Sequence, residues 1–319
     1  MFGKYKLLKR LGAGGMAEVH LAEEQGFAGF TRLVVIKRIL PEHLVDNYFH
    51  DMFINEARVS AYMCHPNLVQ TFEFGRHADG RLFLSMEHVD GITAREWLLR
   101  GFRARTPLPW PAVATVIRDT LLGLHHAHEV KDAAGRPMGV VHRDISPANI
   151  LIGKEGRTRV VDFGIARTDF SWTKTETGHF KGKPTYMPPE QFTGLPVDRR
   201  ADVWAAAAVA YELLTGAPLV SAATAADALA AASAGPGRDL HQRRPDLPNA
   251  LVAVIMSALH PQLEHRLRSA KAFAVALERV AQIQQQTLGE DLVATALDPQ
   301  PKQRKPLPPL GTPPHANAL

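Results

Sequence analysis

The sequence contains very little cysteine and no long apolar run. One cysteine, Cys64, in 319 residues excludes an intrachain disulfide framework and a cysteine-based zinc cluster, and it is compatible with a reducing compartment. The first ten residues lack the apolar core of a secretory signal. The most apolar stretch, residues 203–214, is too short to span a bilayer and contains Glu212. We therefore expect a soluble, cytoplasmic chain without a membrane segment.

The charge balance is also unremarkable. The formal net charge is +5, and the basic residues are scattered along the chain. We find no basic helix that would fit a nucleic-acid groove, so a nucleic-acid partner is not expected. With 45% hydrophobic and 22% charged residues, the composition is that of an ordinary globular protein. The length permits one large domain or two lobes that share a cleft.

The hydrophobic periodicity divides the chain into a β-rich part and a helical part. Strands are predicted at 5–11, 19–23, 33–39, 68–74 and 81–88, with a helix at 46–63 and a short β-rich patch at 140–163. Helices are predicted at 111–129, 201–214, 222–234, 251–259 and 270–286. The expected fold is α+β, with a small β-rich lobe over about 5–90 and a larger, mostly helical lobe over about 91–281. Residues 282–319, rich in proline, are expected to be a disordered tail that could bind a partner.

A glycine-rich turn lies between the first two predicted strands. A hairpin with glycine at its tip lets backbone N–H groups approach phosphates closely, because no Cβ intervenes. This pattern alone is common and therefore weak. It comprises Leu11, Gly12, Ala13, Gly14, Gly15, Met16, Ala17, Glu18 and Val19. The third predicted strand ends on Lys37, whose ammonium could grip phosphates if the helical Glu56 held it in place.

The most informative run is His-Arg-Asp-Ile-Ser-Pro-Ala-Asn at 142–149, followed by Asp-Phe-Gly at 162–164. Asp144 could orient a substrate hydroxyl and accept its proton. Asn149 and Asp162 would bring hard oxygen ligands to Mg²⁺ that bridges phosphates. An acid, an amide five residues later and a second acid beyond a short hairpin are what phosphoryl transfer requires.

These motifs resemble the protein-kinase family in their order, over about residues 5–280. The glycine loop, Lys37, Glu56 and the two acidic motifs are followed by Pro-Pro-Glu at 188–190 and Asp-Val-Trp at 202–204. Glu190, Asp202 and Arg266 match structural residues of the family's large lobe. The forms GAGGMAEV and DFGIAR look most like bacterial eukaryotic-like serine/threonine kinases. The resemblance implies ATP and Mg²⁺, with Mn²⁺ able to substitute, and transfer to Ser or Thr of protein substrates, including the chain itself.

The resemblance also implies an adenine pocket. Met86 would be its gatekeeper, and Glu87 and Val89 would bind adenine through their backbone. Val19, Val35 and Leu151 would enclose the ring. Val35 replaces the family's usual alanine, so we expect a slightly tighter pocket.

Two positions depart from the family. Ser146 stands where most serine/threonine kinases have a lysine that meets the γ-phosphate, and Lys183 stands where they have a threonine. We expect that the two functions have exchanged places, so that Lys183 supplies the positive charge and Ser146 the hydroxyl, because a phosphate binder can be delivered from either loop.

Regulation is expected in the segment between Asp-Phe-Gly at 162–164 and Pro-Pro-Glu at 188–190. Arg143 could hold a phosphorylated loop, and Thr175 and Thr177 are the expected autophosphorylation sites. Ala148 and Thr93 occupy positions where kinases that prefer arginine often carry acids, so no strong preference for basic residues is expected.

Two other classes remain open. A pseudokinase would keep the fold, with or without nucleotide binding, but not turnover. Ser146 favours it, as does Ala17 in place of a third loop glycine. The intact catalytic and metal residues oppose it: Lys37, Glu56, Asp144, Asn149 and Asp162. A small-molecule phosphotransferase would have the same kind of small lobe. The His-Arg-Asp run, the Pro-Pro-Glu segment and the Asp-Val-Trp helix oppose this class.

Overall fold

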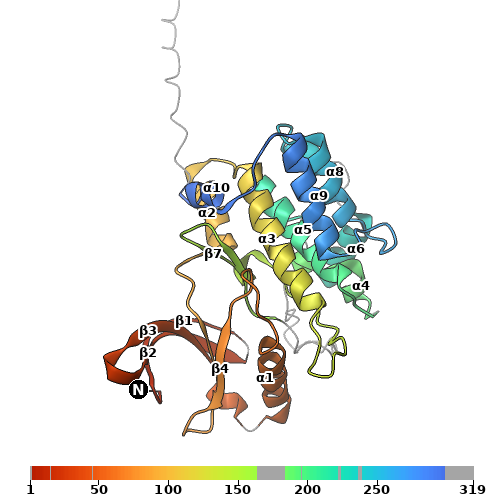
Figure 1. The fold of residues 1–319 in the computed structure, drawn as a ribbon. Helices are drawn as coiled ribbons and strands as arrows, with labels where there is room; N and C mark the ends of the chain where they lie inside the picture. The colour runs from red at the N-terminus through yellow and green to blue at the C-terminus, as the bar shows by residue number, and fades with distance from the viewer. Residues whose placement is uncertain are drawn as a thin grey trace, which may run out of the picture.

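The computed structural model describes residues 2–14, 16–44, 46–163, 184–194, 196–221, 224–235 and 239–298. They form a small lobe, built on a twisted sheet with one helix beside it, and a larger helical lobe (Figure 1). The predicted α+β, two-lobed architecture is confirmed.

The small lobe is a five-stranded antiparallel sheet in the order β1-β2-β3-β5-β4. Its strands are β1 (Tyr5–Ala13), β2 (Ala17–Gln25), β3 (Thr31–Ile39), β4 (Thr71–Arg76) and β5 (Leu82–Glu87), and its helix is α1 (Asn47–Ser60). The Asp46 carboxylate caps α1 by accepting from the Tyr48 N–H. Phe53 of α1 packs with Ile39 and Leu84 of the sheet in a fully buried cluster, which fixes the helix against the strand that carries Lys37.

The large lobe contains a three-stranded sheet and most of the helices. The strands are β6 (Gly91–Thr93), β7 (Ile150–Gly153) and β8 (Thr158–Val160), and the helices are α2 (Ala94–Ala104), α3 (Trp110–His128), α4 (Pro189–Phe192), α5 (Arg200–Thr215), α6 (Ala225–Ala234), α7 (Asp239–Arg243), α8 (Asn249–Ala258), α9 (Ala270–Ile283) and α10 (Glu290–Ala296). Short 3₁₀ turns are η1 (Phe27–Gly29), η2 (Pro41–His43), η3 (Pro147–Asn149) and η4 (Pro184–Tyr186). Helix α5 is buried from Ala201 to Leu214, because its alanines allow neighbouring helices to approach on every side. Helix α2 and strand β6 were not among the predicted elements.

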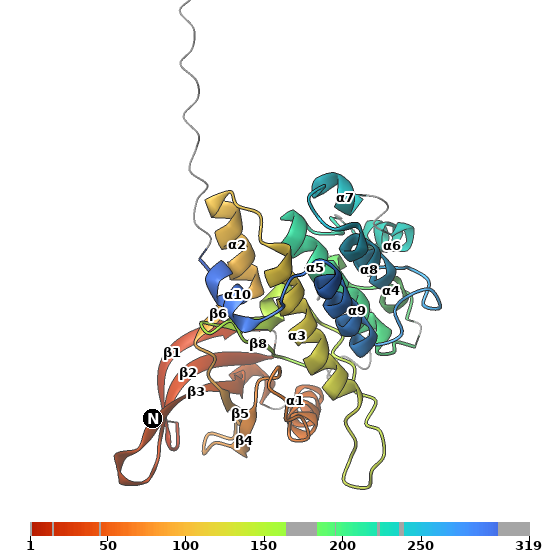
Figure 2. The same cartoon turned by 45° about the horizontal axis from the view of Figure 1, so that its top comes forward.

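Residues 282–298 correct the expected boundary of the folded part. Instead of starting a disordered tail, they pack on the large lobe through α10, which lies beside α2 (Figures 1 and 2). Val293 is fully buried, and the Trp97 indole donates to the Ala296 carbonyl oxygen at 2.7 Å. A Cβ at Gly156 would lie 1.9 Å from the Glu290 carbonyl oxygen, so α10 contacts the β7–β8 turn directly. The proline-rich residues 299–319 lie outside the described residues.

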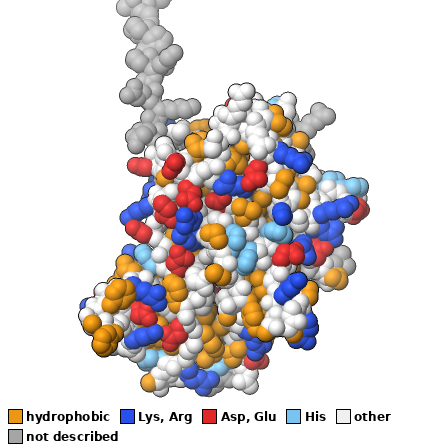
Figure 3. Space-filling model, viewed as in Figure 1, with side chains coloured by type: hydrophobic (Ala, Val, Ile, Leu, Met, Phe, Trp, Pro, Cys, Tyr) orange, Lys and Arg blue, Asp and Glu red, His pale blue; other side chains and the backbone are white. Residues whose placement is uncertain are grey.

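Two further observations concern membrane-spanning helices and surface charge. In the part of the chain that the structure describes, no helix is both long enough and apolar enough to cross a membrane. Acidic and basic side chains are intermixed on the face drawn in Figure 3.

Candidate active site

Lys37 lies between two carboxylates where the lobes meet. Its Nζ is 2.5 Å from Glu56 Oε1 and 2.9 Å from Asp162 Oδ1. Lys37 comes from β3, Glu56 from α1, and Asp162 from the segment after β8. The structure thus brings Asp162, which belongs to a separate motif, to the pair formed by Lys37 and Glu56.

The ammonium of Lys37 is almost completely buried, with 6% of the residue exposed. Burial by itself would lower the pKa of Lys37, but the negative charges of Asp162 and Glu56 outweigh burial and raise this pKa above its usual value. The side chain is therefore a fixed positive charge at neutral pH, which suits it to bind phosphate.

Asp144 and Asn149 are joined within one short loop. The Asn149 amide Nδ2 donates to the Asp144 backbone oxygen at 2.8 Å and lies 3.4 Å from the Asp144 carboxylate. The Val161 N–H donates to the Asn149 backbone oxygen at 3.0 Å. This bond lies just beyond the paired strands β7 and β8, and it holds Asn149 next to Val161, the residue before Asp162.

The oxygen atoms gathered here fit a divalent metal. An amide from Asn149 and a carboxylate from Asp162 are the hard oxygen ligands that Mg²⁺ prefers. Asp162 has a positive φ of 57°, a left-handed conformation that is uncommon outside glycine and that marks functional sites. Asn149 and Asp162 would hold the metal, which would neutralise phosphate charge when bound.

Asp202 holds the backbone that leads into Asp144. Its carboxylate accepts the N–H of His142 at 2.8 Å and that of Arg143 at 2.9 Å, and its Oδ2 lies 2.7 Å from His128 Nε2. Burial would raise the pKa of Asp202, but its interactions with His128 and His142 outweigh burial and lower this pKa. This anchor explains how Arg143 keeps a φ of 64° immediately before Asp144.

His142 is a second support for the loop. Its Nε2 lies 3.0 Å from the Val161 carbonyl oxygen, and the Asp144 N–H donates to its Nδ1 at 3.3 Å. These bonds assign the neutral tautomer that is protonated on Nε2. The ring also packs on Phe163, with 4.6 Å between centroids. His142 therefore ties the segment before Asp144 to the segment that carries Asp162.

Glu190 and Arg266 form a buried ion pair beneath the site. Arg266 donates to the two Glu190 oxygens at 2.7 and 3.0 Å. Its guanidinium also lies 5.0 Å from the Trp204 ring centroid. Arg266 also donates to the Arg200 carbonyl oxygen at 3.1 Å, so the pair fixes α4 against the start of α5.

The glycine hairpin and the expected adenine pocket form the small-lobe side of the site. The Gly14 N–H donates to the Ala17 carbonyl oxygen at 2.8 Å, which closes the described part of the turn. Gly12 pairs with Val19, and Val35 pairs with Met86. The residues expected to surround adenine are all half-buried; they are Val19, Val35, Met86, Glu87, Val89 and Leu151. Leu11 and Ala13 are exposed, and Met16 is half-buried.

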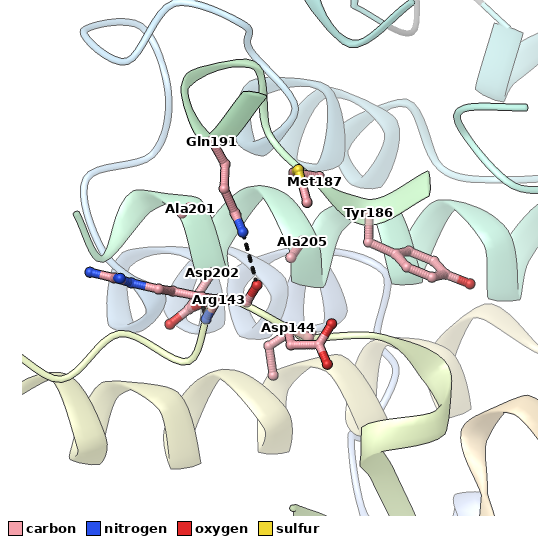
Figure 4. Close-up of a pocket in the computed structure, with 9 residues that line it drawn as sticks. Arg143, Asp144, Tyr186, Met187, Gln191, Ala201, Asp202 and Ala205 are labelled. Atoms are coloured by element: carbon pink, nitrogen blue, oxygen red, sulfur yellow. Dashed lines mark hydrogen bonds between the residues drawn. The ribbon is translucent and has the colours of Figure 1, made fainter. Parts of the chain in front are cut away.

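A small pocket opens beside Asp144 (Figure 4). The residues that line it include Tyr186, Met187 and Gln191. The Gln191 amide donates to the Arg143 carbonyl oxygen at 3.2 Å. The Tyr186 hydroxyl donates to a Glu212 oxygen at 2.5 Å, so this wall is held by a buried hydrogen bond.

Several expected residues fall outside the described part of the chain. These are Gly15 of the glycine hairpin, Lys183, and the expected phosphorylation sites Thr175 and Thr177. Ser146, the proposed partner of Lys183 in the exchange, is described and buried.

Four supporting residues were not found from the sequence. They are His128, Gln191, Tyr186 and Glu212, each of which contacts a loop or helix distant in sequence. His128 had a weak signal, because it ends a helix in the run His-His-Ala-His. The other three stand in ordinary helical or loop contexts.

A lysine held by two carboxylates, an acid beside an amide, and an oxygen pair fit for a metal define a phosphotransferase site. The chain belongs to the protein kinase family: the family's protein kinase domain matches residues 5–278. Members of this family use ATP and a divalent metal ion.

Relatives of the chain include bacterial kinases. The chain is 44% identical over 278 residues to the tyrosine-protein kinase MasK of Myxococcus xanthus, covering 87% of this chain and 43% of that protein. It is 33% identical over 310 residues to the serine/threonine-protein kinase PknH of Mycobacterium tuberculosis, covering 97% and 47%. The chain thus spans less than half the length of these relatives. The crystal structure of the Mycobacterium tuberculosis PknI kinase domain superimposes with a TM-score of 0.63 at 29% identity, covering 88% of this chain and 96% of that one.

Proposed function

We propose that this chain is an active protein kinase that transfers the γ-phosphate of ATP to protein hydroxyl groups, with Mg²⁺ as the metal. The observation that carries this proposal is the position of Lys37, buried and charged between Glu56 and Asp162. A binding module without turnover would need Lys37 to bind the nucleotide. It would not need the loop in which Asn149 is bonded to Asp144.

Each residue has a role that its position supports. Lys37 binds the α- and β-phosphates, and Asn149 and Asp162 hold Mg²⁺. Asp144 orients the substrate hydroxyl and accepts its proton. Backbone groups of the glycine hairpin cover the phosphates, and those of Glu87 and Val89 bind adenine.

The acceptor amino acid is proposed to be Ser or Thr. Several relatives are named serine/threonine-protein kinases, among them PknH and PrkC. The relative named a tyrosine-protein kinase, MasK, keeps the alternative of Tyr open to test.

Phosphorylation of the chain itself is part of the proposal. Arg143, next to Asp144, stands where a guanidinium could hold a phosphorylated threonine. Thr175 and Thr177 are the proposed sites. Mass spectrometry of the wild-type chain and of Asp144→Asn should find phosphate there only in the wild type. Phosphate on both proteins would show that another kinase adds it.

The deciding experiment is incorporation of labelled phosphate from ATP with Mg²⁺, comparing wild type with Asp144→Asn. Phosphoamino-acid analysis then identifies the acceptor. We expect phosphoserine or phosphothreonine that is lost in the variant. Label confined to phosphotyrosine would show that the acceptor is Tyr rather than Ser or Thr. If the wild type binds ATP and is offered generic substrates, yet incorporates no more label than the variant, the chain is a pseudokinase.

A further inference from the structure

A buried carboxylate stands at the base of the glycine hairpin. Glu18 of β2 pairs with Ala13 of β1 on one side and with Arg38 of β3 on the other. Ala13 directly precedes the glycines, and Arg38 directly follows Lys37. Glu18 therefore occupies the point where the phosphate-covering hairpin joins the lysine strand.

Glu18 is surrounded by three arginines and a histidine. Its Oε1 accepts from Arg38 Nε at 2.6 Å and lies 3.6 Å from Arg81. Its Oε2 lies 3.1 Å from His20 Nε2 and 3.7 Å from Arg10 Nε. Only 12% of the Glu18 side chain is exposed, and 14% of that of Arg38. Burial would raise the pKa of Glu18, but His20 and Arg38 outweigh burial and lower it, so the carboxylate stays charged.

The geometry of the strands separates Glu18 from the nucleotide itself. Successive side chains of a strand point to opposite faces of the sheet, and paired residues share a face. Lys37 and its partner Val19 share one face, so Arg38 and its partner Glu18 share the other. Glu18 therefore does not contact bound ATP directly, and its bond to Arg38 acts by fixing β2 against β3.

We infer that Glu18 is a positioning residue for the nucleotide: its ion pair with Arg38 holds the glycine hairpin in place relative to Lys37. A charge-assisted hydrogen bond of this kind is stronger than a neutral one. Without it, the hairpin would spend more of its time away from the phosphates, and ATP would bind more weakly. This inference rests on the proposed kinase function.

The same strand supplies a matched control. Glu24, also in β2, bonds to Lys4 at 2.8 Å and to Arg32 at 2.5 Å, and 14% of its side chain is exposed. It differs from Glu18 in lying near the end of β2 that is remote from the glycine turn. A general weakening of the sheet would appear in both variants, whereas a positioning effect would appear only at Glu18.

The test compares Glu18→Gln, Arg38→Gln, the double variant and Glu24→Gln. For each, the Kd of ATP, the KM and kcat with saturating protein substrate, and the unfolding temperature are measured. We expect Glu18→Gln and Arg38→Gln each to raise Kd and KM for ATP about tenfold, the loss of one charged hydrogen bond, with little change in kcat. The double variant should be no worse than either single one, because the two residues act through one bond. Glu24→Gln should lower the unfolding temperature without changing Kd.

Other outcomes overturn the inference. An unchanged Kd in both Glu18→Gln and Arg38→Gln would do so, as would an equal rise in Glu24→Gln. A lower Kd in Glu18→Gln would show that the released arginines attract the phosphates more than the ion pair orders the hairpin. If Glu18→Gln does not fold, Arg38→Gln alone decides. A wild-type chain that does not bind ATP would overturn the proposed function, and this inference with it.

Discussion

The Lys37 ammonium lies 2.5 Å from a Glu56 carboxylate oxygen, and both residues are buried. This contact joins the third strand of the small lobe to helix α1. Because Asp162 of the large lobe contacts the same ammonium, the position of α1 bears directly on the distance between Lys37 and the proposed metal site.

Replacing Glu56 by glutamine tests this coupling. Glutamine has the same shape but no charge, so the ammonium loses one of its two anionic partners. We expect kcat/KM for ATP to fall about tenfold or more, the range of one charge-assisted hydrogen bond. Initial rates at varied ATP measure it. Glu42→Gln, an exposed carboxylate of η2, serves as the control; equal rates for both variants would contradict the prediction.

The sequence predicted those parts of the site that local chemistry dictates. The segments around Asp144 and Asp162 carry their own residue types at fixed spacing, and Lys37 ends a recognisable apolar strand. The fold class followed from the change from strand-like to helical periodicity near Gly91. These signals are short-range, so a single sequence contains them.

The parts that sequence reasoning missed depend on contacts between distant residues. His128 meets Asp202 across 74 positions, and Trp97 meets Ala296 across 199. Nothing local in the sequence distinguishes such a histidine from an ordinary helix-end residue. Helix α10 was missed because seven residues give too short a periodic pattern next to a proline-rich stretch.

Helix α10 should contribute to the stability of the large lobe. Val293 is fully buried, whereas Leu292, its neighbour on the same helix, is 40% exposed. We expect Val293→Ala to lower the free energy of unfolding by about 2 kcal/mol, since a buried methyl pair is lost and a cavity remains. Leu292→Ala should change it much less. Urea unfolding measures both, and equal effects would show that α10 is not packed as described.

Stability should decrease as the solution becomes acidic. Burial lowers the pKa of His142, and it outweighs the carboxylates of Asp202, Asp144 and Asp162, which favour the charged ring. A histidine whose pKa is lowered by folding contributes stability above its unfolded pKa of about 6.5, and this is lost as the pH falls toward the folded pKa. We expect the free energy of unfolding to fall between about pH 7.5 and 5.5, by up to about 1.4 kcal/mol per pH unit for this group.

Urea titrations across this range measure the slope. The variant His265→Gln, which removes an exposed histidine, should keep it. A free energy of unfolding that stays constant or rises on acidification would show that His142 carries a proton in the folded chain.

The proposed exchange between Ser146 and Lys183 gives the sharpest test of the catalytic centre. If Lys183 supplies the positive charge for the γ-phosphate, Lys183→Thr should lower kcat about a hundredfold, as when one preorganised donor is removed from a transition state. Combining it with Ser146→Lys should recover part of the rate, because the charge is then delivered from the loop of Asp144. Lys181→Thr, two positions earlier in the sequence, controls for a general loss of positive charge. Full activity in Lys183→Thr would disprove the exchange, and a double variant slower than Lys183→Thr would show that Ser146 has a separate role.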